Sequence, residues 1–143
     1  MNKLLTILTI TALLGTAAVA DAAFKAGDYK GKTKWDKPIS FDASKTEVTG
    51  FKIKVQYGCT DFDQFYVTEK GFPAMEIDDE GKFSGRFQND DGSINLKIKG
   101  KLEGKKARGS FEAERTYSGN DLDPNGNVTC MTHKVTWNAK KGG

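Results

Sequence analysis

A two-residue alternation of apolar and polar side chains recurs along most of this 143-residue chain. Such alternation is typical of β-strands with one buried face, because successive side chains of a strand point to opposite sides. Three long strands are therefore expected. Their inward sets are Phe51, Ile53, Val55 and Tyr57; Ile94, Leu96, Ile98 and Leu102; and Ala107, Gly109, Phe111 and Ala113.

Shorter segments with strand character and turn signals lie between these three. Strands are expected at residues 29–33, 39–41, 74–77 and 83–87, with a last strand from residue 128 to residue 137. Glycine-containing turns are expected at residues 78–81, 89–92 and 103–104, since glycine adopts positive φ at little cost. Apolar residues after residue 20 do not recur at helical spacing over an ordinary helix length.

The expected fold is all-β, an antiparallel meander of about seven to eight strands that forms a small barrel or a two-sheet sandwich. Glycines at inward positions suit strongly coiled strands and close backbone approach, which favours the barrel. These glycines are Gly31, Gly85, Gly100 and Gly109.

The first twenty residues have the pattern of a secretory signal peptide. Lys3 precedes an uncharged run that ends in Ala18-Val19-Ala20, and small residues before a cleavage point are typical of such signals. A membrane anchor is the alternative, but the run is short for spanning a bilayer. We expect a signal peptide at 1–20 and a single β-domain at 21–143, secreted or periplasmic, monomeric and without a transmembrane segment.

Cys59 and Cys130 both lie in the expected mature domain. Export delivers paired cysteines to an oxidising compartment, so we expect one disulfide between them. Two free buried thiols or a metal-binding pair are the alternatives, although a zinc site needs more ligands at closer spacing.

The last expected strand contains a break in phase. Cys130 shares even parity with Val128, whereas Met131, His133, Val135 and Trp137 are odd. Both sets cannot face the core of a regular strand, so we expect a β-bulge near Cys130–Met131 or a Cys130 at the strand entry.

Several short motifs carry a resemblance to a wider group of proteins. They are Gly27-Asp28-Tyr29-Lys30-Gly31, Cys59, Gly81-Lys82-Phe83-Ser84-Gly85, Gly109-Ser110-Phe111, Cys130 and Trp137. With them, residues 27–138 resemble small exported bacterial all-β domains of uncharacterised function, and the Gly-aromatic-Gly opening also occurs in lipocalin and avidin barrels. The resemblance implies a fold type and an export route but no activity.

The charge balance argues against nucleic acid as a ligand, and the positions of the lysines predict a basic face. The chain has 22 basic and 19 acidic residues, and this near-balance makes nucleic acid an unlikely ligand. Outward lysines on two expected strands would form a basic face, able to attract anionic polysaccharide, lipid headgroups or nucleic acid. They are Lys52, Lys54, Lys97, Lys99 and Lys101. A solvated sheet face whose lysines discourage edge pairing is the alternative.

Clear alternation is absent between Cys59 and Ala74, and aromatic residues gather there. Loops often carry recognition, and aromatic rings supply large contact areas. A ligand-binding site is therefore predicted at Phe62, Phe65, Tyr66 and Phe72. In the alternative interpretation, these rings plug one end of the barrel.

Asp121, Asp123 and Asn125, followed by Gly126, match the first half of a calcium-binding loop. The motif stops at Thr132, where a bidentate glutamate would complete it. A structural Ca²⁺ is the only cofactor suggested, and an ordinary polar turn is the alternative.

Catalytic patterns are weak. The single histidine, His133, shares the parity of Val135 and is expected to be packed or at an edge, and no serine lies in a nucleophile elbow. Carboxylates adjoin in sequence at Asp61 and Asp63, at Asp78 and Asp79, and at Glu112 and Glu114, the last two facing solvent. Glycosidases need such groups close in space.

We therefore expect a non-catalytic binding or cell-envelope-associated module for an unknown small molecule or envelope polysaccharide. The alternative is a small secreted carboxylate-dependent hydrolase.

Overall fold

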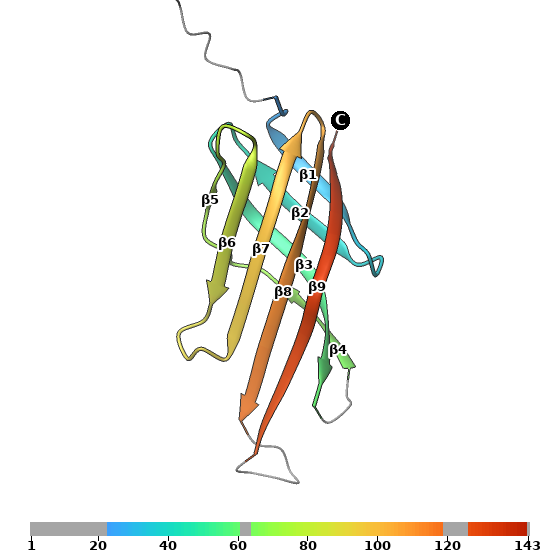
Figure 1. Cartoon of the computed structure of the whole chain (residues 1–143), viewed down its shortest axis with the longest axis vertical. Helices are drawn as coiled ribbons and strands as arrows, with labels where there is room; N and C mark the ends of the chain where they lie inside the picture. The colour runs from blue at the N-terminus through green and yellow to red at the C-terminus, as the bar shows by residue number, and fades with distance from the viewer. Residues whose placement is uncertain (1–22, 61–63, 119–125, 143) are drawn as a thin grey trace, which may run out of the picture.

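The computed structural model describes residues 23–60, 64–118 and 126–142 (Figure 1). Nine strands and no helix lie in this part of the chain, so the expected all-β fold is confirmed. They are β1 (Gly27–Thr33), β2 (Pro38–Ala43), β3 (Glu47–Cys59), β4 (Gln64–Glu69), β5 (Met75–Glu76), β6 (Lys82–Gln88), β7 (Ile94–Glu103), β8 (Lys106–Ser118) and β9 (Asn127–Lys141). No helix that could cross a membrane occurs among the same residues.

The strands form one continuous antiparallel sheet in the order β4-β3-β2-β1-β9-β8-β7-β6. Strand β3 also pairs with β9, which closes β1, β2, β3 and β9 into a four-stranded barrel. The two ends of the sheet are also connected through β5, because β5 pairs with β3 and Ile77, next to β5, bridges to Phe83 of β6. The sheet is therefore a small barrel with additional strands.

Alternation builds the core of this barrel as the sequence predicts. Phe51, Ile53, Val55 and Tyr57 of β3 are all buried, as are Leu96, Ile98 and Leu102 of β7. Strand β2 contributes Phe41, whose ring contacts Tyr29, Phe51, Phe83 and Trp137. These aromatic contacts join residues far apart in the sequence and fill the interior.

Glycines allow the rings to reach across the curved sheet. A Cβ on Gly100 would collide with the Phe83 ring, and a Cβ on Gly109 would collide with the Trp137 ring and the Lys99 carbonyl. The inward glycines thus favour the barrel because aromatic rings pack directly on the glycine backbone, where a side chain would not fit.

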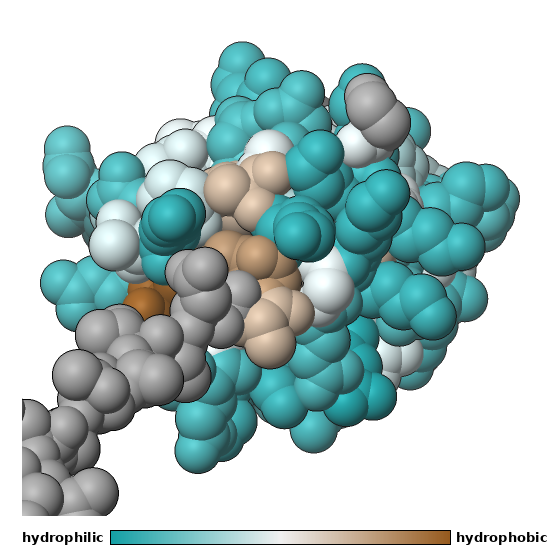
Figure 2. Space-filling view, turned by 90° about the horizontal axis from the view of Figure 1, so that it is seen from above, coloured by the Kyte–Doolittle hydropathy of each residue, from teal (hydrophilic) through white to brown (hydrophobic). Residues whose placement is uncertain are grey.

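The upper end of the barrel in Figure 1 is closed by the chain before β1. Phe24 is buried and bridges to Gly104, while the Tyr29 hydroxyl donates a hydrogen bond of 2.6 Å to the Lys25 carbonyl. Figure 2 views this end from above, where hydrophilic residues surround a small apolar centre.

The phase break in β9 exists, but it lies further along the strand than expected. Phe111 pairs with Val135 whereas Ala113 pairs with Thr132, so His133 and Lys134 together oppose Glu112. Before this bulge, Cys130 and Thr132 point inward and Met131 and His133 are exposed. The expected position of the bulge, near Cys130–Met131, was wrong. Thr132 is buried although it is polar, so the even-numbered residues of β9 continue to face inward as far as residue 132.

Candidate binding surface

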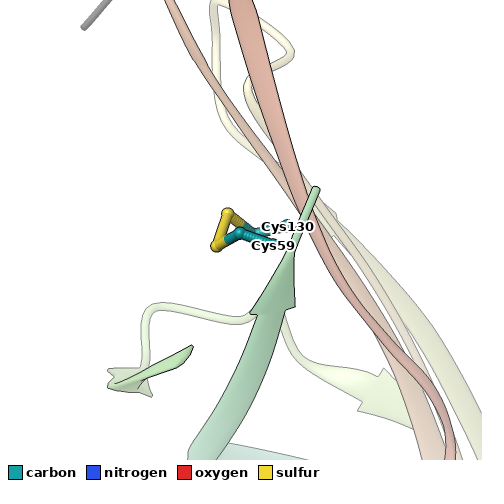
Figure 3. The surroundings of a disulfide bond; sticks show 2 residues. All are labelled: Cys59 and Cys130. Carbon is teal, nitrogen blue, oxygen red and sulfur yellow. A yellow bond between two sulfur atoms is a disulfide. The ribbon is translucent and has the colours of Figure 1, made fainter. Parts of the chain in front are cut away.

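Cys59 and Cys130 form the expected disulfide, with an S–S distance of 2.07 Å. They lie directly opposite each other on β3 and β9, at the pairing that closes the four-stranded barrel (Figure 3). The bond therefore fixes the lower end of the barrel, close to where β4 begins.

The aromatic segment is only partly a surface feature. Phe65 stacks on the buried Tyr57 ring at 5.3 Å, and Phe72 packs between Phe51 and Phe87. Both rings are half-buried against the core, which fits the barrel-plugging interpretation for them. Phe62 lies outside the described residues.

Tyr66 differs from its neighbours, because it lies on the outer face of β4 with 48% of its surface exposed. Strand β4 does alternate, with Phe65 and Val67 inward and Glu69 buried after them. The segment appeared irregular in sequence because a charged residue takes an inward position.

That charged residue belongs to a buried cluster at the lower end of the barrel. Arg115 donates two hydrogen bonds to the Glu69 carboxylate, from Nε at 2.8 Å and from Nη2 at 3.0 Å, and the Tyr57 hydroxyl donates one at 2.7 Å. Burial, together with the Glu69 hydrogen bond, raises the pKa of Tyr57 above its ordinary range. The bonds to Glu69 raise the pKa of Arg115. Arg115 is in phase with Phe111 and Ala113, which is the sequence signal that could have placed it inside.

The five predicted surface lysines do not lie on adjacent strands. Lys52 and Lys54 are on β3, whereas Lys97, Lys99 and Lys101 are on β7, on the other side of the four intervening strands β2, β1, β9 and β8. The strand pairing nevertheless connects them, because other cations fill the outer face between.

Two neighbouring rows of cations run across the strands, and we call them together the cationic belt. In the first row, Lys106 of β8 pairs with Lys140 of β9, Lys140 with Lys30 of β1, and Lys30 through Ser40 with Lys52 of β3. The second row contains Lys82, Lys101, Arg108 and, beyond Asn138, Lys32.

Ion pairs neutralise the second row but not the first. Lys82 pairs with Glu80, Lys32 with Asp36 at 2.6 Å, and both Lys101 and Arg108 with Glu103. Among the residues that the structure describes, no carboxylate lies within ion-pair distance of Lys30, Lys106 or Lys140.

An open groove of about 570 Å³ lies over these same residues. Its lining contains five cations and one carboxylate, namely Lys30, Lys101, Lys106, Arg108, Lys140 and Glu103. The sequence could not place this groove, because its walls come from four strands and are brought together only by the pairing of β1 with β9.

The expected acidic sites are dispersed where they can be located. Asp78 accepts backbone hydrogen bonds from Glu80 and Lys82 in its turn, and Glu112 and Glu114 are exposed on β8. Asp61 and Asp63 lie outside the described residues, and so do Asp121, Asp123 and Asn125. In the part of the chain that is described, no group of three or more His, Cys, Asp or Glu residues could hold a metal ion.

One pair of facing carboxylates was not anticipated. Asp28 and Asp42 lie opposite each other on β1 and β2, and a hydrogen bond with Asp28 raises the pKa of Asp42. Both residues are exposed on the outer face, so the pair is not enclosed in a cleft.

Comparison with known proteins adds no family to this description: no family model matches the chain, and no curated protein matches it in sequence.

Proposed function

We propose that the domain is an exported, non-catalytic module that binds an anionic polymer of the cell envelope through the cationic belt. The observation that carries this proposal is the row Lys106, Lys140 and Lys30, three exposed lysines placed directly side by side on β8, β9 and β1. Like charges directly opposite each other in a sheet are destabilising. An anionic ligand would relieve this repulsion.

Protection against edge pairing does not account for these lysines. Strand β8 pairs with β7 and β9, β9 with β8 and β1, and β1 with β9 and β2. All three strands therefore have both edges occupied, and lysine there has no free edge to block. The placement of the row on inner strands of the sheet therefore supports a binding role over edge protection.

The geometry of the row favours a long ligand over a small ion. From Lys106 on β8 to Lys52 on β3 the row crosses four strand intervals, or roughly 19 Å at about 4.8 Å per interval. A polymer with repeating negative charges can contact each lysine in turn. Such contacts also raise the local concentration of the ligand through long-range attraction.

The modest net charge of +3 is compatible with this surface, because a balance taken over the whole chain does not set the charge of one face. Acidic residues border the belt rather than fill it: Glu103 lies opposite Lys106 across β7 and β8, and Asp28 lies two residues before Lys30 on β1. Export to the envelope, which the signal sequence predicts and the disulfide supports, would bring the domain to acidic polysaccharides and other polyanions.

Binding of the mature domain, residues 21–143, to immobilised polygalacturonate at low and high salt tests the proposal. We expect the double variant Lys106→Gln with Lys140→Gln to bind about tenfold more weakly, because each exposed ion pair contributes up to about 1 kcal/mol. The control is Lys45→Gln with Lys70→Gln, which removes the same charge from exposed positions outside the belt. Equal loss in both double variants would refute a role for the row.

A further inference from the structure

Tyr66 is an exposed aromatic ring with two cations close to it. The Lys37 Nζ lies 4.3 Å from the centre of the ring, and the Lys54 Nζ lies 5.8 Å from it. Both lysines are half-buried. Their stems therefore pack along the surface and place the two ammonium groups beside the ring.

Amide groups adjoin the ring on the same outer face. Tyr66 pairs with Gln56 across β3 and β4, and Gln56 Nε2 donates a hydrogen bond of 3.2 Å to Gln64 Oε1. A flat apolar surface, two ammonium groups and two amides thus occur together.

This cluster continues the first row of the cationic belt. Lys52, the end of that row, is followed at two-residue spacing on β3 by Lys54 and then by Gln56, the partner of Tyr66. A polymer that follows the row across β1 and β2 would therefore arrive at the Tyr66 ring.

We propose that Tyr66, Lys37 and Lys54 form a subsite for an acidic sugar unit, so that the ligand of the belt is a uronic-acid-type polysaccharide. The inference rests on the proposed function. One face of a pyranose ring consists of C–H groups and packs against an aromatic ring, while its carboxylate would bind the two ammonium groups. The amides of Gln56 and Gln64 would supply hydrogen bonds to hydroxyl groups.

A charge-only ligand would not need this ring. Polyphosphate or a phospholipid headgroup presents anionic oxygen atoms and no apolar sugar face, so the belt alone would satisfy it. Polygalacturonate and polyphosphate are therefore the two probes that separate a sugar subsite from a general anion surface.

The test compares Tyr66→Leu with the matched control Tyr66→Phe in the mature domain. We expect Tyr66→Leu to weaken binding of polygalacturonate about fivefold, the scale of an aromatic packing contact, and to leave binding of polyphosphate unchanged. Tyr66→Phe, which keeps the ring, should bind both polymers as the wild type does. If the midpoint of thermal unfolding of Tyr66→Leu equals that of the wild type, the exposed ring is not needed for folding.

The outcomes separate the two proposals. If Tyr66→Leu weakens neither polymer, or both equally, while Lys106→Gln with Lys140→Gln weakens both, the sugar subsite is refuted and the belt remains an anion-binding surface. If that double variant binds both polymers as tightly as the wild type, the proposed function itself fails.

Discussion

The buried cluster of Glu69, Arg115 and Tyr57 makes a sharp prediction about stability. Glu69→Gln preserves the size of the side chain but removes its charge and places an amide NH₂ group within reach of the Arg115 guanidinium. In the wild type the Glu69 carboxylate accepts two hydrogen bonds from the Arg115 guanidinium, at 2.8 and 3.0 Å. The variant loses this charged acceptor. The Tyr57 hydroxyl also loses a charged acceptor at 2.7 Å.

The expected magnitude follows from the burial of the pair. The exposed fraction is 4% for the Glu69 side chain and 19% for that of Arg115, so solvent can replace little of the lost interaction. Breaking a buried pair by removing one partner costs about 3 kcal/mol at the lower end of the usual range. For a domain of this size the midpoint of thermal unfolding should then fall by roughly 10 °C.

Calorimetry of Glu69→Gln beside Glu112→Gln measures this effect. Glu112 is exposed on β8 opposite Lys97, so its substitution should change the unfolding midpoint by little. Replacing the cluster by apolar groups of similar shape, with Tyr57→Phe, Glu69→Leu and Arg115→Met together, should recover much of the loss. If Glu69→Gln and Glu112→Gln unfold at the same temperature, the ion pair does not stabilise the barrel and the reasoning is wrong.

Three further predictions concern the rest of the barrel. Cys59→Ser with Cys130→Ser should lower the free energy of unfolding by about 4 kcal/mol in a denaturant titration, since the bond spans a sequence separation of 71 residues; hydrogen exchange should accelerate first in β4. Stability should decline above about pH 10, because the raised pKa of Tyr57 means that only the unfolded chain ionises there; a flat alkaline unfolding profile would contradict this. Gly109→Ala should cost about 1–3 kcal/mol by displacing Trp137, an effect absent for Gly58→Ala, whose Cβ meets nothing.

Local features of the fold could be predicted from the sequence because they depend on neighbouring residues. Alternation placed the long strands β3, β7 and β8, and the glycine turns are observed with φ of 77° at Gly81, 72° at Gly92 and 58° at Gly104. The disulfide also followed from the sequence, since two cysteines permit only one intramolecular pairing and the predicted export favours its formation.

Features that depend on distant pairing could not be predicted in this way. Strand β9 pairs with both β1 and β3 in the closed barrel, and its pairings with β1 and β8 create the row of Lys106, Lys140 and Lys30. The outward lysines were recognised strand by strand, but their arrangement around the barrel was not. Similarly, Glu69 was assigned to no buried position because its partner, Arg115, is 46 residues away.

The most direct test of the cationic belt is an NMR titration of the isotopically labelled mature domain with polygalacturonate fragments at low salt. We predict that the largest amide shift changes occur at Lys30, Lys106 and Lys140, and that they disappear when salt is raised because exposed charges are then screened. Shift changes confined to residues outside the belt, or changes that persist at high salt, would contradict binding through the belt.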